Sequence, residues 1–278
     1  MEFFLNLLRS VAYGIIEGVT EWLPISSTGH MILAEQVLKF SFSAEFMEMF
    51  RVVIQLGAIL AVVVLYFKKL WPFCADNGRD SGFSRHFRWP VVRLWCKIIV
   101  ACVPAAVLGL LLDDWLDAHL YNSITVALML IIYGIAFILI ERRPRVPTTT
   151  KLSRITYKQA LIVGAWQVLA LIPGTSRSGS TIIGGLLCGM SRPAASQFTF
   201  FLAIPVMAGA SGLKLVKFLA KISALLVGCI VAFVVSMLAI RFLMNYVKKH
   251  TFTAFGWYRI ALGIVVLGIW VLQTFVLA

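Results

Sequence analysis

The 278-residue chain is 60% hydrophobic, carries charge on only 13% of its residues and has a mean hydropathy of +0.92. This composition excludes an ordinary soluble domain and favours a protein of the lipid bilayer. The formal net charge of +13 does not indicate a nucleic-acid-binding protein, because the Lys and Arg residues lie between apolar runs and not along one amphipathic face.

Long uncharged runs recur along the chain, and several approach the ~20 residues that a membrane-spanning helix needs. Transmembrane strands would alternate apolar and polar residues, whereas Ala58–Phe67 and Leu225–Val235 are apolar on all sides. We therefore predict an all-α polytopic membrane protein with about six spanning helices in a single membrane domain over residues 1–278. The apolar runs are 52–67, 98–112, 123–140, 198–213, 222–240 and 260–278.

The N-terminal part predicts a helix that turns back inside the membrane. Met1–Ser10 lacks a basic leader and a small-residue cleavage pattern, so we expect it to belong to the first helix of the mature protein. That helix should end near Leu23, because Pro24 disfavours a helical conformation in the residue before it. Hydroxyl residues that suit a helix N-cap follow. Such a polar break is tolerated at membrane depth only where it is buried in protein or lines a polar cavity.

Residues 17–30 combine two carboxylates, four hydroxyls and an imidazole. Glu17 and Glu21 are four residues apart and share one helix face, where like charges repel unless a cation lies between them. Paired carboxylates with phosphate oxygens are typical ligands of magnesium or calcium. We therefore expect a divalent cation at these two residues. The alternative is a water-exposed pair near a helix end that has no function.

His30 follows Ser27 by three positions. An isolated histidine would most simply cap a helix or bind a buried hydroxyl. Beside a hydroxyl nucleophile, however, a histidine can act as the base that removes the proton. We predict that Ser27 and His30 are catalytic.

Two basic segments indicate the cytoplasmic side of the membrane. Residues 68–97 hold seven basic and two acidic residues, and residues 142–158 hold six basic residues and no acidic one. The connection at 113–117 has three Asp and no Lys or Arg, so it should lie outside. The first hairpin then opens outward and the second opens inward. This scheme places three lysines of segment 214–221 on the outer side, against the usual tendency.

Residues 173–181 form a second hydroxyl-rich turn, in which six of nine residues can donate a side-chain hydrogen bond. Hydroxyls and amides at a helix start bind phosphate, and Arg177 adds a bidentate cation. Alternatively, Arg177 is the buried ion-pair partner of Glu17 or Glu21; such a pair could also be the resting state of a site that exchanges its carboxylates for phosphate. The predicted phosphate-binding residues of the two turns are Ser26, Thr28, Ser176, Ser178, Gly179 and Thr181.

The two turns indicate an internal duplication. Each has an apolar helix, a proline, a hydroxyl-rich turn, a glycine and another helix. Three crossings follow each hairpin, and an odd number of crossings reverses the second copy. We predict an inverted-topology repeat with copies at about 1–141 and 155–278, and two re-entrant helical hairpins that meet near mid-membrane. The residues aligned by a shift of 150 positions include Gly14 with Gly164, Glu17 with Gln167, and Ser26 with Ser176.

Other features have structural interpretations. The pairs Gly14–Gly18 and Gly185–Gly189 have the four-residue spacing that lets helices approach closely. Trp257, Tyr258 and Trp270 are expected to be interfacial anchors. The five cysteines show no paired spacing, so we expect neither a disulfide framework nor a cysteine metal site.

The two turns resemble the motifs of the undecaprenyl-diphosphate phosphatase family, also known as bacitracin-resistance proteins. Glu17–His30 fits that family's Glu-Gly-x-Thr-Glu-Phe-Leu-Pro-x-Ser-Ser-Thr-Gly-His segment, with Trp22 in place of Phe. Pro173–Thr181 fits its Pro-Gly-x-Ser-Arg-Ser-Gly-x-Thr segment. The resemblance covers essentially the whole chain, and its specificity depends on these two motifs.

The resemblance implies hydrolysis of undecaprenyl (C55-isoprenyl) diphosphate at the outer side of the bacterial plasma membrane. This reaction would recycle the lipid carrier for cell-wall synthesis and confer bacitracin resistance. The residues leave open whether Ser27 forms a covalent phosphoserine or His30 activates water. The implied roles are nucleophile for Ser27, proton transfer for His30, metal binding for Glu17 and Glu21, and stabilisation of phosphoryl charge for Arg177.

Two other functions remain open. A polyprenyl-phosphate transporter or flippase would use the same cradle, since inverted repeats with broken helices recur in transporters. The combination of Ser27, His30 and two acids exceeds what phosphate binding requires and favours the enzyme. A non-catalytic membrane partner would leave the mid-membrane charges unexplained. The expected partners are a polyprenyl diphosphate and membrane lipids, without nucleic acid, and the sequence leaves a homo-oligomer open.

Overall fold

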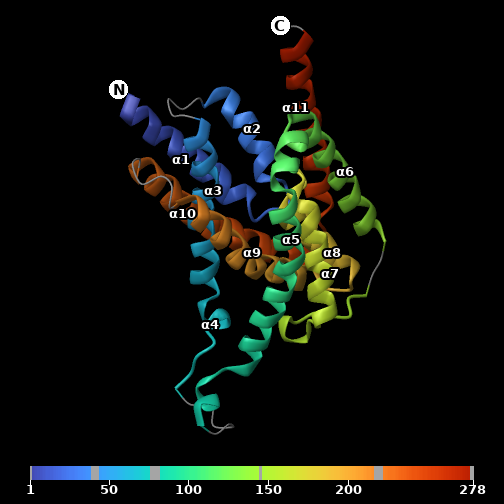
Figure 1. Cartoon of the computed structure of the whole chain (residues 1–278). Coiled ribbons are helices and arrows are strands. Elements are labelled where there is room, and N and C mark those ends of the chain that lie inside the picture. Colours follow the sequence, from blue (N-terminus) through green and yellow to red (C-terminus); the bar gives the residue numbers. More distant parts are fainter. Residues whose placement is uncertain (1, 39–43, 76–81, 144–145, 216–221, 276–278) are drawn as a thin grey trace.

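A computed structural model of the chain describes residues 2–38, 44–75, 82–143, 146–215 and 222–275. Within this part the chain is helical, and its β-pairing is limited to two isolated bridges. Three short 3₁₀ helices are η1 (Gly82–His86), η2 (Leu152–Arg154) and η3 (Leu169–Leu171). The α-helices (Figure 1) are α1 (Glu2–Thr20), α2 (Ser27–Val37), α3 (Ala44–Leu65), α4 (Phe67–Leu70), α5 (Trp89–Leu120), α6 (Ser123–Arg142), α7 (Tyr157–Val168), α8 (Arg177–Leu187), α9 (Arg192–Leu215), α10 (Ile222–Lys249) and α11 (Thr253–Phe275).

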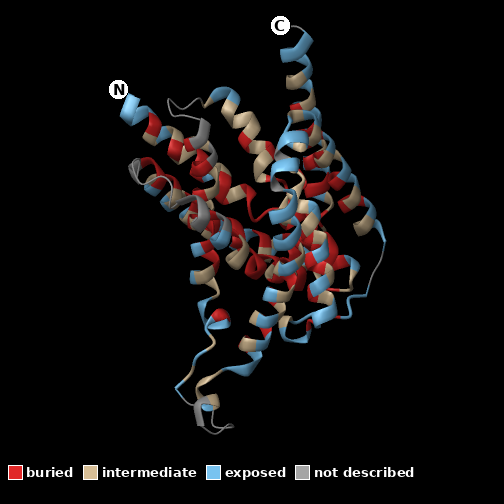
Figure 2. Cartoon of the chain, viewed as in Figure 1, coloured by how far each residue is buried: buried red, intermediate tan, exposed pale blue. Residues whose placement is uncertain are grey.

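In the described part of the chain, four helices are long and apolar enough to cross a membrane: α5, α6, α10 and α11. Their outer faces expose many Leu, Ile and Val side chains (Figure 2). Such surface is costly in water and compatible with lipid tails. The protein is therefore an all-α polytopic membrane protein, as the sequence predicts.

Two of the predicted spanning segments lie in helices outside this group of four. Most of segment 52–67 lies in α3, and segment 198–213 lies in α9. In α3 an apolar stretch runs over Met49–Leu65. Both helices pack against each other, and Phe198 and Phe201 of α9 are fully buried. Protein contacts thus replace part of the lipid contact that a peripheral spanning helix would have.

The two proline turns have the same unusual helix caps. Ser26 precedes α2 and Ser176 precedes α8, and both have φ of 72°. Each side chain accepts a hydrogen bond from a backbone amide of its own helix, at Gly29 and Gly179. Positive φ is uncommon outside glycine, so a matched pair of such caps supports the predicted duplication. In Figure 1, α1 and α2 lie in the upper half and α7 and α8 in the lower half, and the repeat boundaries themselves remain a prediction.

Glycines allow the hairpins to pack closely on neighbouring helices. A Cβ on Gly14 would lie 2.7 Å from the carbonyl oxygen of Gly228, where α1 packs along α10. A Cβ on Gly164 would lie 2.5 Å from the carbonyl oxygen of Ala101, where α7 packs along α5. A Cβ on Gly18 would meet an α10 side chain at 2.7 Å. The predicted packing role of the first glycine pair is confirmed.

The second glycine pair has two different roles. A Cβ on Gly185 would lie 2.8 Å from the Cβ of Ala195, which is the predicted close packing. Gly189 follows α8 with φ of +89°, a conformation that side chains disfavour. The prediction of packing alone was therefore incomplete, because Gly189 is needed for the turn between α8 and α9.

Candidate active site

The first turn holds its two acidic residues inside the protein. Glu17 is 1% exposed and Glu21 is 6% exposed. The amide of Glu21 donates to the carbonyl of Glu17 at 3.0 Å, so both residues belong to the last helical turn before Pro24. This burial contradicts the alternative of a water-exposed pair. Both carboxylates are therefore enclosed by protein, as a binding or catalytic site requires.

The second turn contacts the first directly. Arg177 Nη2 lies 3.1 Å from Glu21 Oε1, across 156 positions of sequence. Ser178 Oγ donates to the carbonyl of Leu23 at 3.3 Å. Arg177 Nη1 also donates to the carbonyl of Thr199 at 3.0 Å, which fixes the guanidinium against α9. The two turns therefore form one site, and the Arg177–Glu21 ion pair that the sequence left as an alternative is present.

Ser27 lies at the start of α2 and is half-buried. Its Oγ donates to Glu21 Oε2 at 3.0 Å. Because Arg177 holds the other carboxylate oxygen, Glu21 is fixed between a hydroxyl and a guanidinium. A carboxylate in this position can accept the hydroxyl proton, and the guanidinium can stabilise developing negative charge.

His30 has other partners than the predicted contact with Ser27. Its Nδ1 lies 2.7 Å from the carbonyl oxygen of Ser26, and its Nε2 lies 2.7 Å from the Tyr258 hydroxyl. The two rings are also stacked, with centroids 5.6 Å apart and an interplanar angle of 8°. Both ring nitrogens of His30 are thus engaged, and Glu21 holds the Ser27 hydroxyl instead. Tyr258, expected to be an interfacial anchor, contacts the site.

The predicted phosphate-binding residues divide into accessible and structural groups. Ser178 and Thr181 are fully buried, and Thr181 Oγ1 donates to the carbonyl of Arg177 at 2.8 Å. Thr181 Oγ1 also lies 2.9 Å from Thr199 Oγ1, so it joins α8 to α9. Gly179 contributes its amide to the Ser176 cap. The partly accessible residues of the two turns include Ser27, Thr28, His30, Ser176 and Arg177.

The sequence analysis missed Arg259, although it joins the two turns. Arg259 is fully buried in α11 and donates to the carbonyls of Pro24, Gly174 and Thr175 at 3.3, 2.9 and 2.9 Å. Its guanidinium also lies 5.5 Å from the ring centroid of Tyr133. The signal that could have revealed it is an arginine within the otherwise apolar last helix, because charged residues inside membrane helices are usually functional.

Glu17 and Gln167, aligned in the predicted repeat, are both buried with unpaired polar atoms. Glu17 Oε1 and both amide atoms of Gln167 have no hydrogen-bond partner within the described residues. An unpartnered buried carboxylate oxygen is costly unless a ligand or cation reaches it. Two carboxylates on one helix face fit the predicted magnesium or calcium site. Among the described residues, no cluster of three or more His, Cys, Asp or Glu side chains is arranged to hold a metal ion; phosphate oxygens and water are the other ligands that such cations usually take.

The fold and the two turns define an integral membrane protein in which two polar turns, distant in sequence, contact each other. The Glu21 carboxylate, the Ser27 hydroxyl and the Arg177 guanidinium lie in contact among its helices. The sequence matches the family described as bacitracin resistance protein BacA over residues 10–265. The chain belongs to this family.

Proteins named undecaprenyl-diphosphatase are similar to the chain over nearly its whole length. One from Enterococcus faecalis is 58% identical over 277 residues, covering 96% of this chain and 98% of the relative. One from Desulfitobacterium hafniense is 56% identical over 273 residues, covering 94% and 95%. One from Streptococcus gordonii is 55% identical over 282 residues, covering 98% of each. The family resemblance of the two motifs is therefore confirmed.

Proposed function

We propose that the chain hydrolyses undecaprenyl diphosphate to undecaprenyl phosphate and inorganic phosphate. Relatives that share more than half of its residues carry the name of this activity. The observation that carries the proposal is the contact of Glu21 with both Ser27 and Arg177. These contacts support the proposed roles of Ser27 as nucleophile, Glu21 as proton acceptor and Arg177 as anion-binding group.

In the proposed reaction, Ser27 Oγ attacks the terminal phosphorus, and its proton moves to Glu21. The bond from phosphorus to the bridging oxygen breaks, and undecaprenyl phosphate leaves with the electron pair. Water then displaces the serine oxygen from phosphorus, Glu21 returns the proton to Ser27, and dihydrogen phosphate leaves. The engaged ring nitrogens of His30 favour this sequence over direct attack by a water that His30 activates.

Charge stabilisation comes from groups that the fold holds in place. Arg177 is fixed by Glu21 and the Thr199 carbonyl, so little reorganisation is needed when phosphate arrives. It begins α8, whose N-terminus adds partial positive charge. His30, held by Ser26 and Tyr258, is proposed to bind a phosphate oxygen and not to take the Ser27 proton.

Magnesium or calcium is the cofactor that we propose for Glu17 and Glu21. The burial of both carboxylates and the unpaired Glu17 Oε1 support this assignment. When bound, the cation would neutralise phosphate charge and polarise a phosphoryl oxygen. Glu21 would then contribute both to cation binding and to the proton transfer from Ser27.

We place the protein in the bacterial plasma membrane with the active site open to the outer side. The α1–α2 hairpin supports this orientation, because the predicted topology opens it away from the basic segments 68–97 and 142–158. A lipid substrate could then enter from the bilayer while its diphosphate reaches the two turns.

Phosphate release tests this function. Purified protein is given undecaprenyl diphosphate with and without a chelator, and the native chain is compared with Ser27→Ala and Arg177→Ala. We expect cation-dependent release that falls by at least about 10²-fold in both variants. The matched control is Ser153→Ala, an exposed serine of η2, which should retain native activity.

The same preparations distinguish the alternatives. A radiolabelled phosphoryl group that stays on the native chain and not on Ser27→Ala would support the covalent step. Absence of release by well-folded native protein, together with movement of polyprenyl phosphate across vesicles, would replace the enzyme with a transporter.

A further inference from the structure

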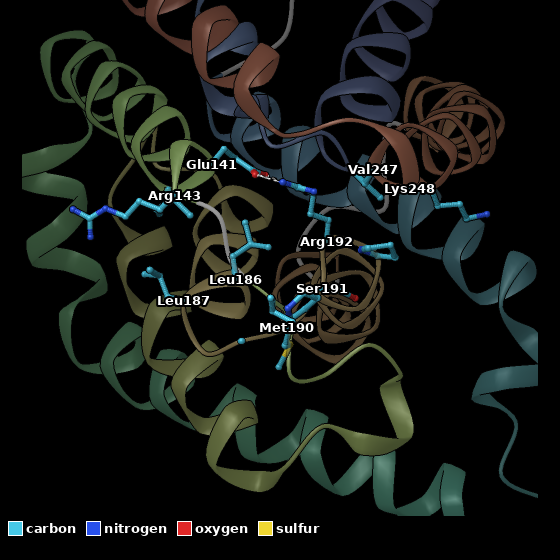
Figure 3. A pocket seen from close by; sticks show the side chains of 14 residues that line it. Glu141, Arg143, Leu186, Leu187, Met190, Ser191, Arg192, Val247 and Lys248 are labelled. Atoms are coloured by element: carbon cyan, nitrogen blue, oxygen red, sulfur yellow. Dashed lines mark hydrogen bonds and ion pairs between the residues drawn. The ribbon is translucent and has the colours of Figure 1, made fainter.

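A cavity with charged and apolar lining lies apart from the active-site turns. Its volume is about 740 Å³. The end of α6, the turn between α8 and α9, and the end of α10 surround it (Figure 3). Helix α8 connects the two places, since it begins at Arg177 in the active site and ends at Leu187 beside the cavity.

Cations outnumber carboxylates around this cavity. Arg143, Arg192 and Lys248 line it, and Glu141 is the single acidic residue among its described lining residues. Arg192 Nε donates to the two Glu141 oxygens at 2.8 and 3.1 Å, and Arg192 Nη2 contacts Glu141 as well. The amide of Phe252 donates to Glu141 Oε1 at 3.0 Å. The carboxylate is thus already neutralised, and Arg143 and Lys248 leave the rim positively charged.

Most of the remaining lining residues are apolar. Leu186, Leu187 and Met190 contribute this apolar surface. The neighbouring segment 142–158 carries six basic residues and no acidic one, which predicts the cytoplasmic side. A phosphodiester with attached acyl chains matches a cationic rim above an apolar wall. Basic pockets between helices on the cytoplasmic side bind anionic lipid headgroups in this way.

We propose that this cavity binds the headgroup of an anionic phospholipid from the cytoplasmic leaflet. A bound lipid would bridge α6, α9 and α10 and hold the turn between α8 and α9. The hydroxyls of Thr181 and Thr199, 2.9 Å apart, join α8 to α9 one turn beyond Arg177. The lipid therefore stabilises the helix that carries the active-site arginine.

Lipid binding to the full-length protein tests the proposal. Protein in phosphatidylcholine nanodiscs is titrated with phosphatidylglycerol, and bound lipid is counted by native mass spectrometry. The double variant Arg143→Gln/Lys248→Gln removes the two rim cations. Its matched control is Arg142→Gln/Lys249→Gln, which changes the same charge at adjacent exposed positions outside the cavity lining.

We expect the native chain and the control to prefer phosphatidylglycerol over phosphatidylcholine, and the rim variant to lose roughly tenfold in affinity for it. Equal losses in both double variants would overturn the proposal, because general surface charge would then explain the binding. Absence of any preference in the native chain, or displacement by isoprenyl monophosphate but not by phosphatidylglycerol, would also overturn it. Should the double variant fail to fold, the single changes Lys248→Gln and Lys249→Gln give the same comparison.

Discussion

Glu21 connects the chemistry of the two turns through its two oxygens. One oxygen accepts a hydrogen bond from the Ser27 hydroxyl, and the other forms an ion pair with Arg177. These three residues were all identified from the sequence, because each lies in a short motif dense with polar groups inside an apolar chain. The pairing of Arg177 with Glu21 was one of two alternatives, whereas the contact of Ser27 with Glu21 was not identified, since a spacing of three residues suggested His30 as the base. The backbone turn at Ser26 instead directs Ser27 toward Glu21 and His30 toward Tyr258.

The His30–Tyr258 contact predicts a measurable effect of one hydroxyl. Tyr258→Phe keeps the stacked ring and removes the partner of His30 Nε2. Loss of one hydrogen bond of about 1 kcal/mol should lower kcat roughly fivefold with little change in KM. The measurement is phosphate release at saturating and limiting substrate. The matched control is Tyr157→Phe, an exposed tyrosine of α7, and native kinetics in Tyr258→Phe would return Tyr258 to the predicted role of interfacial anchor.

At the scale of helices, most boundaries follow from local chemistry. Helices α1 and α7 end at Thr20 and Val168, a few residues before the prolines of the two turns, and the apolar runs 98–112, 123–140 and 222–240 lie within α5, α6 and α10. Segments 52–67 and 198–213 were harder to interpret from hydropathy alone. They lie in α3 and α9, which pack against each other, and a helix surrounded by protein needs no uniformly apolar surface.

Helix packing predicts unequal costs for the same substitution at different glycines. Gly14→Ala and Gly164→Ala place a Cβ 2.7 and 2.5 Å from carbonyl oxygens of the facing helices. Relieving such contacts should destabilise the protein by about 1–3 kcal/mol each. Gly268→Ala is the control, because nothing lies within 4 Å of its Cβ position and alanine is the better helix former.

The midpoint of denaturation in one detergent would measure these effects. Gly14→Ala and Gly164→Ala should lower it, whereas Gly268→Ala should leave it unchanged or raise it. Equal midpoints for all three variants would show that neither the contact of α1 with α10 nor that of α7 with α5 depends on these glycines.

At the scale of the whole molecule, a single arginine from the last helix ties the two hairpins together. The sequence predicted that the turns meet, because the basic segments orient the helices between them. It gave no indication that Arg259 would donate to the carbonyls of Pro24, Gly174 and Thr175. Such a contact depends on tertiary packing, since Arg259 lies 84 positions from the nearest of these residues.

Replacement of Arg259 should therefore affect both stability and catalysis. Arg259→Met leaves buried carbonyls without donors, each costing about 1–3 kcal/mol, so the melting temperature and kcat should both fall. Arg259→Lys should recover part of each, since one ammonium can reach fewer carbonyls than the guanidinium fork. Arg241→Met on the exposed face of α10 is the control. An active, stable Arg259→Met variant would show that the turns hold together without this contact.

The orientation of the molecule in the membrane can be tested from its two ends. Val37, at the end of α2, is 81% exposed, and Val146, after α6, is 92% exposed. The predicted topology places Val37 outside and Val146 in the cytoplasm. It also places the three lysines of segment 214–221 outside, and two of these lysines lie outside the described residues. In a chain with its five cysteines replaced, a membrane-impermeant thiol reagent should label Val37→Cys in intact cells and Val146→Cys only in inverted vesicles. Labelling of both from one side would reject the outward-facing site, because hairpins that open to opposite sides require these two positions to lie across the membrane from each other.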